Sequence, residues 1–162
     1  MIRTINDFLD RWRDEKAATL KVFSYMTDDS LRQSVPSGRS LGRLANHIVE
    51  TLTGLPAQAG LLPSKELLPY ATVKELMEVY ENDADLVAEA VSSGWHDGML
   101  EDETPMYGDN WKKGFVLWAL ITHQAHHRGQ MTALMRFADL KVPGVYGPSK
   151  EEWAAYNMAP MA

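Results

Sequence analysis

Residues 116–140 read VLWALITHQAHHRGQMTALMRFADL, and this stretch decides the fold that we expect. Its apolar residues recur every three or four positions, which is typical of an amphipathic helix. At about 100° per residue, Val116 and Leu134 point in the same direction, which defines the side that faces the core. His123 and His127 fall about 20° on either side of that direction. The pair is therefore predicted to be buried.

Two imidazoles that lie four residues apart on one helix face can share a metal ion. Burial of both rings is costly unless their nitrogens have partners, and carboxylates or backbone carbonyls are the alternative partners. For the pair alone the two interpretations stay open. His126 lies about 80° from the core direction, at the edge of the apolar stripe. His47 is nominated as a third ligand, whereas His96, in an acidic linker, is expected to be a solvated loop residue.

Three further segments show the helical period. The first begins at a weak capping box of Thr4 and Asp7 and ends near residues 27–30. The second begins near Ser40, and its end stays open between Gly54 and residue 61.

The third segment begins at a capping box of Thr72 and Glu75 and ends at Gly94. The histidine-bearing helix is expected over 110–140. Four such helices predict an all-α four-helix bundle, in a single domain that spans residues 1–162.

No strand-like alternation of useful length is present elsewhere in the sequence. The form of the linker 95–109 stays open, a short hairpin being one option. After Gly144 we expect an irregular C-terminal tail with a single turn near residues 151–156.

The composition limits the function. The chain has 162 residues, a formal charge of −6 and no cysteine. Negative charge argues against nucleic acid or an anionic membrane as partner. Without cysteine, a metal must be held by nitrogen and oxygen ligands, and a reacting thiol must come from a substrate. We see no signal peptide or membrane-spanning stretch and expect a cytoplasmic protein.

Other residues near the histidines are candidates for supporting roles. Gln124, Gln130 and Glu50 are candidates for hydrogen bonds to the ligands or a bound water, with Glu50 as candidate proton acceptor, although a surface or helix-packing role is favoured for all three. His126 is expected near the ligands rather than on the ion.

Two further residues of the histidine-bearing helix invite predictions. Arg128 is predicted to pair with a carboxylate. Gly129 should cost about 1 kcal/mol relative to alanine inside a helix, which indicates close contact with another helix or subunit.

Three sequence motifs resemble the DinB-like (YfiT-like) family of metal-binding four-helix proteins. They are HQAHHRGQM at 123–131, LGRLANHIVE at 41–50 and RFADLKVPGVYGPSKEEW at 136–153. By this resemblance, the metal ligands are His47, His123 and His127. The resemblance also implies an up-down-down-up bundle and frequently a homodimer. The long link needed between the second and third helices is available in residues 55–71.

Three histidines alone would leave a coordination position open, because structural zinc sites are normally closed by four protein ligands. Zinc or nickel is the expected ion, with manganese or iron as alternatives. The first hypothesis is an enzyme that transfers a low-molecular-weight thiol such as bacillithiol, an activity that the resemblance implies for some members. The second is a hydrolase that uses metal-bound water. The third is a non-enzymatic, stress-related metal-binding dimer.

Overall fold

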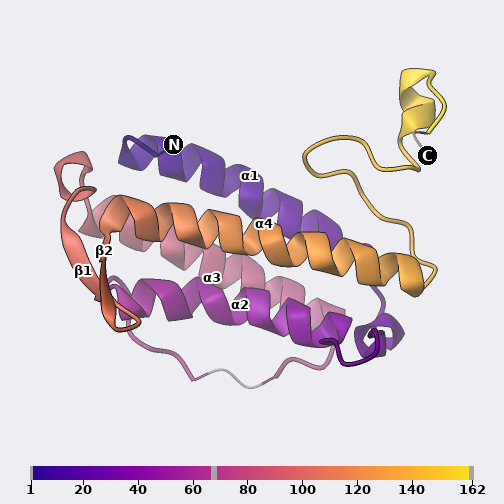
Figure 1. The fold of residues 1–162 in the computed structure, drawn as a ribbon, viewed down its shortest axis with the longest axis horizontal. Helices are drawn as coiled ribbons and strands as arrows, with labels where there is room; N and C mark the ends of the chain where they lie inside the picture. Colours follow the sequence, from indigo (N-terminus) through magenta and orange to yellow (C-terminus); the bar gives the residue numbers. More distant parts are fainter. Residues whose placement is uncertain (1, 67–68, 161–162) are drawn as a thin grey trace.

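Four long helices pack side by side in the computed structural model, which describes residues 2–66 and 69–160 (Figure 1). The helices are α1 (Ile5–Phe23), α2 (Leu41–Gln58), α3 (Val73–Gly94) and α4 (Lys113–Phe137). α1 packs mainly against α3 and α4, and α2 packs mainly against the same two helices. Each of α3 and α4 thus bridges α1 and α2.

The helix directions follow the expected up-down-down-up order. α1 and α4 run one way, and α2 and α3 run the other way (Figure 1). The parallel pair α2 and α3 is joined by a long connection, whose described residues 59–66 and 69–72 run along the outside of the bundle. This connection leaves α2 and α4 as antiparallel neighbours, which brings the histidine-bearing helices together.

Side-chain caps fix where the first three helices begin. Thr4 and Asp7 form a capping box before α1, and Thr72 and Glu75 form another before α3. The Ser40 hydroxyl accepts a hydrogen bond from a backbone N–H in the first turn of α2. Each cap satisfies backbone donors that the helix itself leaves unpaired, and all three predicted starts are confirmed.

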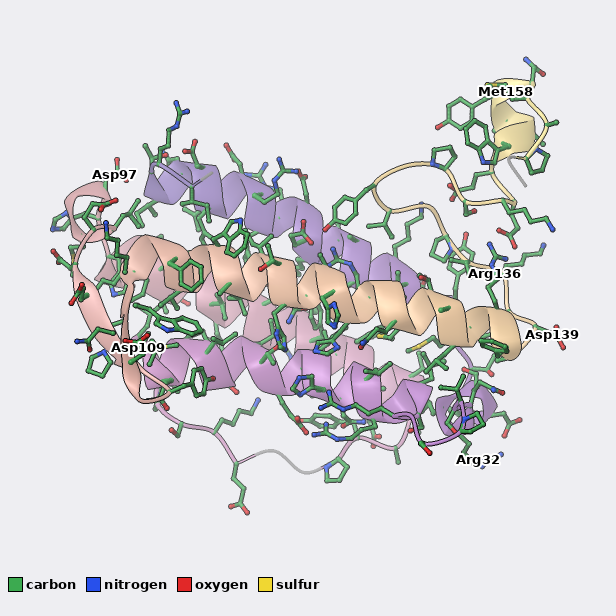
Figure 2. All side chains as sticks on the ribbon, in the orientation of Figure 1. Arg32, Asp97, Asp109, Arg136, Asp139 and Met158 are labelled. Carbon is green, nitrogen blue, oxygen red and sulfur yellow. The ribbon has the colours of Figure 1, made fainter. Side chains whose placement is uncertain are left out.

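The core is built from the apolar stripes of all four helices. Its largest fully buried members include Trp12 and Phe8 of α1, Ile48 and Leu52 of α2, and Leu120 of α4. Side chains fill the space between the ribbons along the whole length of the bundle (Figure 2). The helices are therefore held at fixed distances, which matters for any site built from two of them.

The prediction that α4 begins at residue 110 was wrong. Residues Glu103–Met106 form β1 and Asp109–Lys112 form β2, and the two strands pair antiparallel as a short hairpin. The two residues between them, Tyr107 and Gly108, both have positive φ, as a tight hairpin turn requires. Pairing with β1 keeps residues 109–112 extended, so the helix starts at Lys113.

Two helix ends also bear on the expectations: the end of α4 differs from the expected position, and the end of α2, which the sequence left open, is now defined. α4 ends at Phe137 rather than 140, because Asp139 adopts a left-handed backbone conformation. α2 continues through Pro56 and stops at Gln58, and Gly60 with its positive φ turns the chain away.

The remaining described elements are short 3₁₀ turns at Asp29–Arg32, Asp97–Met99 and Trp153–Tyr156. The last of these lies within the predicted turn of the tail. The tail leaves the end of α4 near Arg136 and Asp139 and carries Met158 away from the bundle (Figure 2). Among the described residues, no helix is long and apolar enough to span a membrane.

Candidate metal centre

Three imidazole rings meet between α2 and α4. His47 comes from α2, and His123 and His127 come from successive turns of α4. The Nε2 atom of His123 lies 3.1 Å from Nε2 of His47 and 3.1 Å from Nε2 of His127. The three residues form a group whose candidate ligand atoms all lie within 4.8 Å of one another.

These distances fit a single small cation. Ligand nitrogens about 2.0–2.1 Å from a zinc ion lie about 3.3 Å apart at a tetrahedral angle. At a right angle, as in six-coordinate ions, the same bond length gives about 2.9 Å. The two measured separations of 3.1 Å fall between these values. The donor set, three imidazoles, suits zinc, nickel, iron or copper better than magnesium or calcium.

Hydrogen bonds at the far side of two rings fix which nitrogen faces the centre. Nδ1 of His47 lies 3.3 Å from Oε2 of Glu50, and Nδ1 of His127 lies 2.7 Å from Oε1 of Gln130. Both partners are acceptors, so each Nδ1 carries the proton and each Nε2 presents a lone pair to the centre.

The electrostatics of the rings favour the neutral form that a metal needs. Burial lowers the pKa of His123 to about 4, with smaller contributions from His127 and His47. Burial also lowers the pKa of His127, against the opposing effect of its hydrogen bond to Gln130. At neutral pH both rings are therefore unprotonated, and no proton competes strongly with a cation for their nitrogens.

Glu50 is held by two partners on its own helix. Arg43 donates to both carboxylate oxygens at 2.9 Å, and His47 donates from Nδ1. Burial alone would raise the pKa of Glu50, but these hydrogen bonds outweigh it and the pKa lies below its usual value. The carboxylate is thus ionised and orients His47, as outer carboxylates do for many metal-binding histidines.

One side of the centre is accessible. The His47 side chain is 21% exposed and the Glu50 side chain 39% exposed, whereas His127 is only 5% exposed. Within residues 2–66 and 69–160, no fourth side chain that could serve as a ligand joins the group. The arrangement therefore resembles open, three-ligand sites more than closed structural ones.

The other residues singled out in the sequence take different positions. Gln130 contacts a ligand, as predicted. Gln124 is fully buried and bonds α2 and α3 rather than a histidine ring. His126 is exposed, with its ring centroid 4.9 Å from that of His127, and His96 is exposed in the linker. Neither belongs to the three-histidine group.

Arg128 is paired as expected. It is buried and donates to Glu15 and, at 2.9 Å, to the Thr19 hydroxyl, both on α1. Tyr146 from the tail donates to the same Glu15 carboxylate at 2.8 Å. This polar cluster fastens the C-terminal tail and α1 to the residue that follows His127.

Sequence reasoning missed Arg43, on the same helix as Glu50, and also missed the partners that cross between helices. Arg43 could have been identified from the sequence, because residues seven positions apart on a helix share one face and Glu50 lies seven positions after Arg43. Thr51 and Tyr80, which bond Gln124, gave no local signal, since their contacts depend on how three separate helices meet.

The fold agrees with comparisons to known proteins. A sequence model described as the DinB family matches residues 1–160. A Bacillus subtilis (strain 168) protein named "Uncharacterized protein YrdA" is 36% identical, over 98% of this chain and 97% of that protein. This chain belongs to the DinB family.

Solved structures give the same assignment. The crystal structure of a DinB-like protein from Bacillus cereus ATCC 10987 is 38% identical to this chain and superposes with a TM-score of 0.83. It covers 90% of this chain and 100% of its own. The DinB-like protein YjoA of Bacillus subtilis is 14% identical, with a TM-score of 0.67 over 86% of this chain and 97% of its own, and shares the fold.

Proposed function

We propose that this chain is a divalent-metal-dependent enzyme that transfers a low-molecular-weight thiol to an electrophile. The observation that carries the proposal is the convergence of three imidazole nitrogens on a centre that one side leaves accessible. His47, His123 and His127 would hold the ion. Zinc or nickel is favoured because imidazole suits these ions, and manganese or iron are the alternatives.

The neutral ligands define what chemistry the centre supports. Imidazole ligands carry no negative charge, so an ion held by three of them keeps its full positive charge. Such an ion lowers the pKa of a thiol or a water that binds it. The chain itself has no cysteine, so the thiol has to come from a substrate.

Residues of the chain would position the reactants and accept the proton. Glu50 is ionised, partly exposed and adjacent to His47, so it can take up the proton that a thiol gives up. Its bonds to Arg43 make it a weak base, which suits an acidified thiol better than an ordinary alcohol. The exposed edge between α2 and α4 gives a substrate access to the centre.

The direct test is a conjugation assay. Metal-loaded protein is incubated with bacillithiol, and with a panel of other small thiols, in the presence of monochlorobimane. A sulfur–carbon bond forms, chloride leaves and the thiol proton passes to the protein or to solvent, which yields a fluorescent product. We expect product formation that depends on metal and fails in His123→Ala. Absence of metal-dependent conjugation with every thiol would reject the proposal.

A metal-dependent hydrolase is the alternative, and the position of Glu50 favours it specifically. In metal-dependent hydrolases, a water bound at a free coordination position of the ion acts as nucleophile, and a carboxylate beside the ion can accept its proton. Release of nitrophenol from nitrophenyl esters by the metal-loaded protein, without thiol, would favour this alternative. A stress-related, non-enzymatic dimer is the remaining hypothesis, and it predicts that metal changes only the melting temperature.

We also propose that two copies of the chain pair along the exposed face of α4. Phe115 and Trp118 are 45% and 47% exposed on this helix. Within the described residues, nothing outside its own helix and its chain neighbours comes within 4 Å of the place where a Gly129 side chain would begin. A glycine inside a helix is unfavourable, and close approach by a second molecule would explain it.

A further inference from the structure

The Gln124 side chain links three helices beside the three-histidine group. Its amide nitrogen donates to the Ile48 carbonyl oxygen at 3.0 Å and to the Thr51 hydroxyl at 2.9 Å, both on α2. Its amide oxygen accepts a hydrogen bond from the Tyr80 hydroxyl of α3 at 3.2 Å. Gln124 is 0% exposed, so these contacts take place without competition from water.

The partners of Gln124 are placed next to the metal ligands in the chain. Ile48 directly follows His47 on α2, and Gln124 directly follows His123 on α4. The bond from Gln124 to the Ile48 carbonyl therefore joins the backbone of one ligand helix to the other at the level of the three rings. We propose that Gln124 is a positioning residue that sets the separation of His47 from His123 and His127, and thereby the affinity for the ion.

The physical reason is that hydrogen bonds depend on direction, whereas apolar contacts do not. Apolar side chains between α2 and α4 stabilise contact but permit small shifts of one helix along the other. A hydrogen bond weakens steeply when its length or angle changes, so two of them from one amide fix both the spacing and the register. Because the amide is buried, any shift that broke these bonds would leave polar groups without partners.

The Tyr80 contact completes the arrangement. Burial raises the pKa of Tyr80, so its hydroxyl stays protonated and donates. This bond satisfies the Gln124 amide oxygen on α3, whereas both bonds to α2 are made by the amide nitrogen. The contact does not reach α2, so Tyr80 provides a matched control for the position of the ligands.

The inference rests on the metal centre of the proposed function, and its test measures metal binding rather than turnover. Zinc affinity of the tag-free, full chain is measured by competition with a chromophoric chelator, for the wild type, Gln124→Leu, Gln124→Met and Tyr80→Phe. The folding of each metal-free variant is checked by circular dichroism and urea unfolding. The cobalt-loaded proteins are compared by their visible absorption spectra.

We expect both Gln124 variants to fold without metal and to bind zinc about 10- to 100-fold more weakly, as for other residues that orient metal ligands. Their cobalt spectra should shift, whereas Tyr80→Phe should keep both the wild-type spectrum and an affinity within about threefold. Wild-type affinity in the Gln124 variants would overturn the inference. So would failure of both to fold without metal, since the amide would then serve folding. Absence of zinc binding by the wild type would instead reject the metal centre itself.

Discussion

Arg128 of α4 and Glu15 of α1 form an ion pair in which each side chain is 2% exposed. The pair lies one residue beyond His127, and the tail residue Tyr146 bonds the same carboxylate. A buried charge is stable only while its partner is present, because water cannot reach it. The pair therefore controls whether the second half of α4 stays docked.

Removal of one partner should destabilise the chain strongly. We predict that Arg128→Met lowers the free energy of unfolding by about 3–5 kcal/mol, since Glu15 is then a buried charge without its cation. Urea unfolding followed by circular dichroism measures the change. As a control, Arg13→Ala removes the exposed pair with Asp10 and should change stability by less than about 1 kcal/mol. Equal effects of the two substitutions would contradict the prediction.

The metal-free protein should lose stability in mild acid. The pKa of His123 is lowered by burial to about 4, against a usual value of 6.5. Between these two pH values the unfolded chain holds a proton on this ring and the folded chain does not. Stability is therefore retained above pH 6.5 and falls as the pH is lowered toward 4.

Urea unfolding of chelator-treated protein at pH 7, 6, 5 and 4 measures this loss. His123→Asn removes the titrating ring and should flatten the decline. His96→Asn, in the exposed linker, provides the matched control and should leave the decline unchanged. An identical decline in wild type and His123→Asn would show that other groups cause it.

Much of the fold could be predicted from local sequence. α3 is the clearest case, because the capping box of Thr72 and Glu75 and the stop at Gly94 both act within a few residues. The start of α4 could not be predicted in the same way. Residues 110–112 include no residue that prevents helix formation. They are held extended by pairing with the strand Glu103–Met106.

The same distinction between local sequence and tertiary packing applies to the candidate site. The inward positions of His123 and His127 follow from helix geometry, and the contacts of His47 with Glu50 and of His127 with Gln130 join residues three positions apart. The role of Gln124 could not be predicted, since its partners lie on two other helices. Sequence pattern thus locates the three candidate ligands, whereas tertiary packing decides which residues orient them.

Replacement of Glu50 should separate its two candidate roles. Glu50→Gln keeps an oxygen that can accept from His47 but loses the charge that Arg43 neutralises. We predict zinc affinity within about tenfold of the wild type, because the ring stays oriented. Retained thiol conjugation would assign Glu50 to orientation alone. A loss of turnover with full metal occupancy would instead identify it as the proton acceptor.

The proposed pairing of two copies predicts an effect at Gly129. We expect the wild type to have the mass of a dimer by light scattering and Gly129→Leu to have that of a monomer, because the added side chain would separate the two helices. Thr132→Ala, on the same exposed part of α4, is the matched control and should stay dimeric. A monomeric wild type, or an unchanged dimer in Gly129→Leu, would contradict the prediction.

The most direct test of the metal centre is elemental analysis of protein purified without a histidine tag. Each of His47→Ala, His123→Ala and His127→Ala is compared with the wild type and with His126→Ala, which alters the neighbouring exposed ring. We predict about one divalent ion per chain in the wild type and in His126→Ala, and near-complete loss in the other three. A wild type that binds no ion, or that keeps it when His123 is replaced, would contradict a three-histidine metal centre.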